Sequence, residues 1–95
     1  MTYEISPQDK FNPVDEVTWR DINGEVVALK LVSGEYYSFN EVGRLSWLSI
    51  TEGKQVSQIV DHIVENYETT LEQAWKDLNE FITGLMEHKL LVKGE

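Results

Sequence analysis

The chain contains no cysteine, which excludes disulfides, thiolate metal sites, iron–sulfur ligation and a cysteine nucleophile. It also contains no apolar run close to the roughly 18 residues that a membrane-spanning helix needs. Its first ten residues show no basic segment followed by an apolar stretch, so no signal peptide is visible. These absences predict a soluble, cytoplasmic protein.

Positive charge is scarce in this sequence. Eight Lys and Arg stand against 17 Asp and Glu, which gives a net charge of −9. Nucleic-acid binding relies on cationic side chains that displace phosphate counterions, and an anionic membrane surface repels an acidic chain. The charge balance therefore argues against both nucleic acid and membranes as partners. The simplest role of the acids is to keep a small protein in solution.

The length of 95 residues fits one domain with a modest core. Residues 1–16 show no regular hydrophobic period and contain both prolines of the chain. They predict an extended N-terminal arm that Phe11 and Val14 tether to the remainder. Residues 17–95 are then the single domain.

Three segments of alternating hydrophobicity follow the arm, at residues 17–22, 25–31 and 35–39. Asn23-Gly24 suits a two-residue hairpin turn, because both residue types tolerate positive φ. Val32-Ser33-Gly34 provides the next turn. Connections this short exclude parallel crossovers, so the pattern predicts a three-stranded antiparallel meander.

Three helices are predicted after the strands. Asn40 is a good N-cap for the first, whose apolar stripe ends near Gly53, and Ser57 is the expected cap of the second. Residues 70–73 (Thr-Leu-Glu-Gln) match a capping box at the start of the third. A small sheet followed by three helices is an α+β fold with a winged helix-turn-helix-like layout.

Two orientations stay open from periodicity alone. Tyr36 and Tyr37 are adjacent on a strand and must point to opposite faces. The third helix carries two apolar rows, of which one packs on the domain and the other either is covered by the first two helices or lines a groove beside the third strand. The two rows are Ala74, Leu78, Phe81 and Leu85, and Leu71, Trp75, Ile82 and Met86.

No pattern for catalysis or for metal binding is present. His62 and His88 are far apart and have no metal-ligand spacing, so no metal or other cofactor is expected. The serines lack a G-x-S-x-G context, and the six glycines are dispersed. A winged-helix transcription regulator is disfavoured, because the predicted third helix holds four acids, two lysines and no arginine. The sequence therefore predicts a protein that is not an enzyme.

Residues 31–48, LVSGEYYSFNEVGRLSWL, resemble the pyrroloquinoline quinone biosynthesis protein D family, in which a turn and a strand precede an Asn-capped helix with a Trp. The resemblance continues through Gly53, residues 56–67 and residues 77–91, and covers most of the chain. Within this family the sequence is most similar to the stand-alone leader-binding proteins of lasso-peptide biosynthesis.

Members of that family are RiPP recognition elements, which bind the leader of a ribosomally synthesised precursor peptide and deliver it to a leader peptidase or other modifying enzyme. The resemblance implies that the leader adds as a strand to the third predicted strand, beside the third helix. It also implies a rim at which Asp77 and Glu80 attract a basic leader residue. The implied peptide-binding residues are Glu35, Tyr36, Tyr37, Ser38, Phe39, Ala74, Trp75, Asp77, Leu78 and Ile82.

Two further alternatives remain at this point. The protein could act as a peptide chaperone in a quinone-cofactor or another modified-peptide pathway. Its exposed strand edge also allows either a monomer or a weak homodimer.

Overall fold

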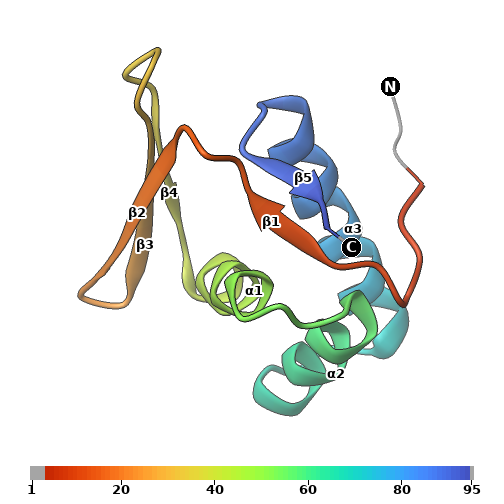
Figure 1. The fold of residues 1–95 in the computed structure, drawn as a ribbon. Helices are drawn as coiled ribbons and strands as arrows, with labels where there is room; N and C mark the ends of the chain where they lie inside the picture. Colours follow the sequence, from red (N-terminus) through yellow and green to blue (C-terminus); the bar gives the residue numbers. More distant parts are fainter. Residues whose placement is uncertain (1–3, 95) are drawn as a thin grey trace.

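The computed structural model describes residues 4–94 and has the predicted α+β architecture (Figure 1). A three-stranded sheet is followed by three helices, and a second, two-stranded sheet joins the two ends of the chain. In chain order the elements are β1 (Phe11–Pro13), β2 (Val17–Ile22), β3 (Glu25–Lys30), β4 (Tyr36–Phe39), α1 (Glu41–Thr51), α2 (Val56–Asn66), α3 (Leu71–Glu87) and β5 (Leu91–Lys93).

The predicted meander is confirmed: β2, β3 and β4 form an antiparallel sheet in that order. Its first turn has φ of 51° at Asn23 and 83° at Gly24, and positive φ at both positions matches the twist of a two-residue hairpin. The second strand ends at Lys30, one residue before its predicted end, and the third begins at Tyr36 instead of residue 35.

Side-chain caps start the first and third helices, as predicted, but the Gln73 side chain bonds to Asp77, so the predicted capping box at residues 70–73 is only half formed. Asn40 Oδ1 accepts a hydrogen bond from the Gly43 N–H at 3.2 Å, and Thr70 Oγ1 accepts one from the Gln73 N–H at 3.1 Å. These bonds satisfy N–H groups that have no partner within the helix.

The predicted Ser57 cap of the second helix is wrong, since Gln55 is the N-cap residue. The N-terminal arm satisfies this helix end instead. The N–H groups of Val56 and Ser57 donate to the carbonyl oxygens of Asp9 and Pro7, each at 2.9 Å. The arm is distant in sequence, so no local pattern predicts its part in the cap. The Gln55 N–H also donates to Gln58 Oε1 at 2.9 Å, which is a local contact.

The arm also contributes a strand that the sequence pattern did not predict. β1 pairs with β5 in antiparallel register, Phe11 opposite Lys93 and Pro13 opposite Leu91, and Figure 1 shows these two strands side by side. The side chain of Phe11 is 2% exposed, so it is the tether that its sequence position suggested. The tail thus folds back onto the body of the protein through β5.

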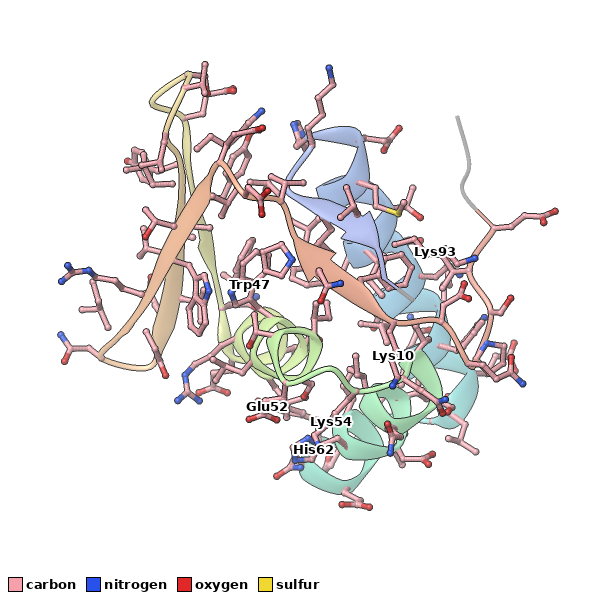
Figure 2. The ribbon with its side chains drawn as sticks, in the orientation of Figure 1. Lys10, Trp47, Glu52, Lys54, His62 and Lys93 are labelled. Atoms are coloured by element: carbon pink, nitrogen blue, oxygen red, sulfur yellow. The ribbon has the colours of Figure 1, made fainter. Side chains whose placement is uncertain are left out.

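Helix α1 lies between the three-stranded sheet and α2 (Figure 1). Its Trp47 projects into the interior (Figure 2) and is completely buried. The Trp47 ring meets the ring of Trp19 from β2 edge to face, with centroids 6.2 Å apart. Close-packed aromatic contacts of this kind fix the sheet against the helices, and so fix the position of β4 relative to α3.

Candidate functional site

Strand β4 offers one unpaired edge. It pairs with β3 on one side, and within residues 4–94 no strand pairs with its other side. The Lys30 N–H donates to the Glu35 carbonyl at 2.8 Å, which marks these two residues as a hydrogen-bonded pair. Such pairs alternate along an antiparallel ladder, so the N–H and C=O groups of Tyr36 and Ser38 point away from β3. The free edge therefore presents the backbone donors and acceptors of two residues.

The side chains of β4 resolve the choice between the two tyrosines. Tyr36 is 72% exposed, whereas Tyr37 is partly buried and packs against the core. The cross-strand neighbours of Tyr37 and Phe39 are Ala28 and Val26, both fully buried. Tyr37 and Phe39 consequently face inward, and Tyr36 and Ser38 face outward.

Two aromatic contacts connect the inner face of β4 to α3. The rings of Phe39 and Phe81 meet nearly at right angles with centroids 5.3 Å apart. The rings of Tyr37 and His88 lie 5.5 Å apart at the end of the same helix. Lys30 Nζ, at the end of β3, donates to the His88 carbonyl at 3.0 Å. These contacts hold α3 along the strand.

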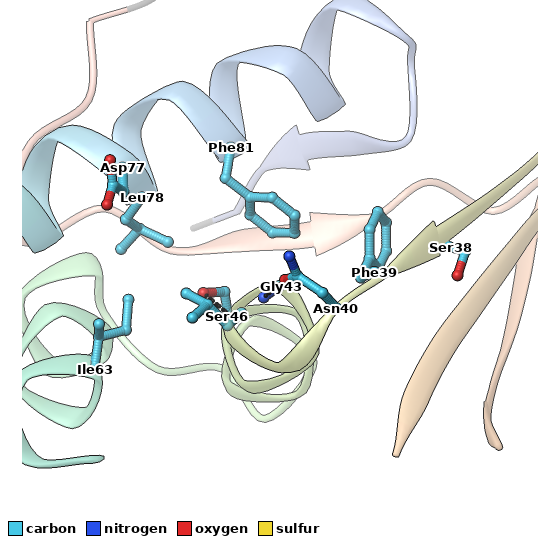
Figure 3. Close-up of a pocket in the computed structure, with 10 residues that line it drawn as sticks. Ser38, Phe39, Asn40, Gly43, Ser46, Ile63, Asp77, Leu78 and Phe81 are labelled. Atoms are coloured by element: carbon cyan, nitrogen blue, oxygen red, sulfur yellow. Dashed lines mark hydrogen bonds between the residues drawn. The ribbon is translucent and has the colours of Figure 1, made fainter. Parts of the chain in front are cut away.

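A pocket of about 410 Å³ opens where β4, the start of α1 and the middle of α3 meet (Figure 3). Its walls combine aromatic and aliphatic side chains with a few polar ones. The lining residues are Ser38, Phe39, Asn40, Val42, Gly43, Ser46, Ile63, Asp77, Leu78 and Phe81.

Gly43 lets α1 approach the pocket closely. A Cβ atom at this position would lie 2.9 Å from Phe39 Cβ and 3.4 Å from Phe81 Cε1. The first distance is shorter than real Cβ contacts allow. The absence of a side chain at Gly43 is therefore a condition for the Phe39–Phe81 contact.

Asp77 is the acidic group of the pocket. Gln73 Nε2 donates to Asp77 Oδ1 at 2.8 Å across one turn of α3. Among the residues that the structure describes, no Lys or Arg forms an ion pair with Asp77. The carboxylate is exposed at the pocket wall, so it is available to a cationic group from outside.

The described part of the chain contains no cluster of three or more His, Asp or Glu side chains that could hold a metal ion. Among the same residues, no helix has both the length and the hydropathy needed to cross a bilayer.

The structure brings some of the predicted site residues together. Ser38, Phe39, Asp77 and Leu78 line the pocket. Tyr37 does not line the pocket and instead contacts His88 at the end of α3. Tyr36 points outward on the same strand, and Glu35 lies just before that strand. Exposed Glu80 does not line the pocket.

The remaining predicted residues on α3 lie elsewhere. Ala74 and Ile82 are 1% and 0% exposed and belong to the core. Trp75 lies in a separate apolar groove with Pro7, Val60 and Leu71. This separation follows from helical geometry. Residues two positions apart point about 200° apart around the helix axis, so Trp75 faces away from the pocket that Asp77 lines.

On α3 the pocket wall consists of Asp77, Leu78 and Phe81, so one predicted row contributes two residues to it and the other row none. The buried face of α3 consists of Ala74, Leu78, Ile82 and Leu85, taken from both rows. The pocket side is one step further round the helix, at Asp77 and Phe81. Sequence reasoning missed Phe81 as a site residue, although it had placed this residue in an apolar row. The other missed lining residues are Asn40, Val42, Gly43, Ser46 and Ile63.

Comparison with solved structures finds two similar chains. A structure described as TbiB1 in complex with the TbiA(beta) leader peptide is 34% identical, with a TM-score of 0.80, and the match covers 83% of this chain and 92% of that one. A structure described as lasso peptide synthetase B1 complexed with the leader peptide has a TM-score of 0.83 at 22% identity, over 87% and 98% of the two chains. The second likeness concerns the fold alone.

A comparison with curated proteins returns no match. The family model described as coenzyme PQQ synthesis protein D (PqqD) matches residues 25–91, which include β3, β4, all three helices and the start of β5. The free strand edge and the pocket beside it lie wholly within this match. The chain therefore belongs to the coenzyme PQQ synthesis protein D (PqqD) family.

Proposed function

We propose that this protein binds the leader segment of a ribosomally synthesised precursor peptide in a lasso-peptide pathway. It acts without catalysing a reaction and presents the bound leader to a separate leader peptidase or other modifying enzyme in the cytoplasm. The observation that carries the proposal is the free edge of β4, which opens directly onto an apolar pocket. The 34% identical chain whose structure holds a leader peptide supports the same conclusion.

The proposed binding mode is strand addition to β4. An incoming peptide strand pairs with the outward-directed N–H and C=O groups of Tyr36 and Ser38. Peptide residues directly opposite Tyr37 and Phe39 then turn their side chains toward the inner face, because cross-strand neighbours share a face. The side chain opposite Phe39 reaches the pocket.

This mode divides affinity and selectivity between two parts of the site. Backbone pairing depends little on the peptide sequence, so it supplies general affinity for an extended segment. The pocket, with Phe39, Leu78 and Phe81 in its walls, selects the side chain that it covers. A leader is thereby distinguished from other extended peptides.

The deciding experiment is a titration with two synthetic peptides, the leader and the core of the precursor encoded beside this protein. Tryptophan fluorescence and calorimetry follow the binding. We expect saturable binding of the leader and none of the core. Failure of the leader to bind at tens of micromolar concentration contradicts the proposal.

Amide hydrogen exchange locates the bound strand. In the free protein the Tyr36 and Ser38 amides face solvent, whereas those of Tyr37 and Phe39 face β3. Leader binding is expected to slow exchange at Tyr36 and Ser38 most strongly. Equal changes at all four amides indicate a general stabilisation and argue against strand addition at this edge.

A further inference from the structure

We infer that the pocket beside β4 receives a lysine or arginine side chain of the leader, whose aliphatic stem lies against Phe81 and Leu78 and whose cationic end meets Asp77. This inference rests on the proposed function and names the chemistry that the same site selects.

The walls of the pocket suit the stem of a long side chain. Ile63 of α2 and Leu78 of α3 are 3% and 1% exposed, and the partly exposed Phe81 ring of α3 lines the same pocket. Lysine and arginine bury their methylene groups along apolar surfaces while their charged ends stay at a polar edge. In Figure 3 the aromatic pair lies between Ser38 at one end and Asp77 at the other.

Most polar groups of the pocket are already engaged within the protein. Ser38 Oγ donates to Glu25 Oε2 at 2.8 Å, and Ser46 Oγ donates to the Val42 carbonyl at 2.8 Å. Asn40 Oδ1 accepts from the Gly43 N–H. These groups cap a helix or tie strands together, and they leave Asp77 as the single carboxylate in the lining.

The Asp77 carboxylate is held in place but not neutralised. Gln73 Nε2 binds Oδ1 at 2.8 Å and leaves Oδ2 without a hydrogen bond within the described chain. A purely apolar peptide side chain would cover this charge without a partner, and an unpaired buried charge opposes binding. A cationic end instead forms a charge-assisted hydrogen bond with Oδ2. One side chain then covers the apolar walls with its methylene stem and pairs with the Asp77 carboxylate through its charged end.

Two further features favour a cation at this position. The chain carries a net charge of −9, which attracts a basic segment and repels an acidic one. The partly exposed ring of Phe81 also lines the pocket together with Asp77, and aromatic rings attract cations.

The test combines peptide and protein variants. Each Lys or Arg of the cognate leader is replaced in turn by norleucine, which keeps the stem and removes the charge. Calorimetry measures each peptide with the wild-type protein and with Asp77→Asn. We expect one position at which norleucine lowers the affinity for the wild-type protein about five- to tenfold, and does not lower it for Asp77→Asn.

Glu72→Gln is the matched control. It removes an equal charge from the same helix, but Glu72 lies in the separate groove beside Trp75. This variant is expected to bind every peptide nearly as the wild-type protein does and to show no coupling to any leader position. Circular dichroism confirms that both variants are folded.

Each remaining outcome overturns the inference. A leader without a basic residue in its bound strand does so, as does an Asp77→Asn variant that binds all peptides with wild-type affinity. A loss of affinity in Asp77→Asn that is not coupled to any Lys or Arg position means that Asp77 meets another group of the leader. In all three cases saturable leader binding leaves the proposed function standing, whereas loss of leader binding by the wild-type protein removes both.

Discussion

Phe39 on β4 and Phe81 on α3 meet edge to face, with ring centroids 5.3 Å apart and an angle of 77° between the ring planes. The contact joins the edge strand to the third helix at the mouth of the pocket. Phe81 is therefore part of both the wall of the site and the packing of α3. A comparison of Phe81→Ala with Trp75→Ala on the same helix separates the effect on leader affinity from the effect on stability.

Phe81→Ala is expected to lower the affinity for the leader peptide about tenfold or more, because it removes an aromatic wall next to the bound strand. Since the ring is partly exposed, the free energy of unfolding should fall by only about 1–3 kcal/mol, less than for a fully buried aromatic. Calorimetric titration measures the affinity at a temperature where the variant is folded.

Trp75→Ala provides the contrast on the same helix. Trp75 lies outside the pocket and packs against the core, so its loss should lower the stability while leaving the affinity for the leader within about twofold of the wild type. A large loss of affinity in this variant, or none in Phe81→Ala, shows that the leader contacts the other side of α3.

Ser38→Pro is expected to weaken leader binding about three- to tenfold with little change in fold. Proline lacks an N–H, and the Ser38 N–H points toward the free edge and not toward β3. Tyr37→Pro removes an N–H that bonds to β3 and should destabilise the sheet itself. Unchanged leader affinity in a folded Ser38→Pro protein rules out backbone pairing at this edge.

Gly43→Ala tests the close approach of α1 to β4. Alanine favours a helix over glycine by about 1 kcal/mol, yet its Cβ would lie 2.9 Å from Phe39 Cβ. We expect the steric conflict to dominate and to lower the free energy of unfolding by about 1–3 kcal/mol, measured in urea.

Gly84→Ala is the control for that substitution. Gly84 is also within a helix, but a Cβ there meets no atom within 4 Å. Its replacement should raise the free energy of unfolding by about 0.5–1 kcal/mol. If both variants are stabilised alike, the approach of α1 to Phe39 is looser than the structure describes.

The pairing of Asp21 with Arg44 makes the stability of the protein depend on pH in the acid range. The side-chain hydrogen bonds from Arg44 hold the pKa of Asp21 below its ordinary value of 3.8, with Arg44 Nη2 and Asp21 Oδ2 2.7 Å apart. A carboxylate whose pKa is lower in the folded protein contributes stability above its unfolded pKa and loses it as the pH falls through the folded value.

Urea unfolding of the wild-type protein and Asp21→Asn between pH 7 and pH 2 checks this. The difference in free energy of unfolding between the wild type and Asp21→Asn should be constant near neutrality and shrink below about pH 4. It should also be small, because the pair is exposed to solvent. An advantage that grows on acidification contradicts the assignment.

Local sequence signals predicted the elements that local contacts build. The hairpin at Asn23-Gly24 and the caps at Asn40 and Thr70 each depend on residues within three positions of one another. The strand side of the site was predicted for the same reason, since alternation along β4 allows only two phases. Only the cross-strand partners Val26 and Ala28 decide between them.

The helix side of the site was less predictable. Apolar periodicity identified a face on α3 that is wider than one contact needs, but Trp75 and Phe81 look equivalent in such a pattern. Their surroundings differ, because Trp75 shares a groove with Pro7 from the N-terminal arm, whereas Phe81 contacts Phe39 from β4. Both neighbours come from distant parts of the chain, so the choice depends on tertiary contacts.

The pairing of β1 with β5 has a consequence for how the protein is made. Phe11 lies opposite Lys93, 82 positions further along the chain (93 minus 11). A growing chain can form the hairpin of β2 and β3 and all three helices before residue 93 has left the ribosome. β1 can pair only after β5 has been made, so this small sheet closes after the hairpin and the helices between its two strands.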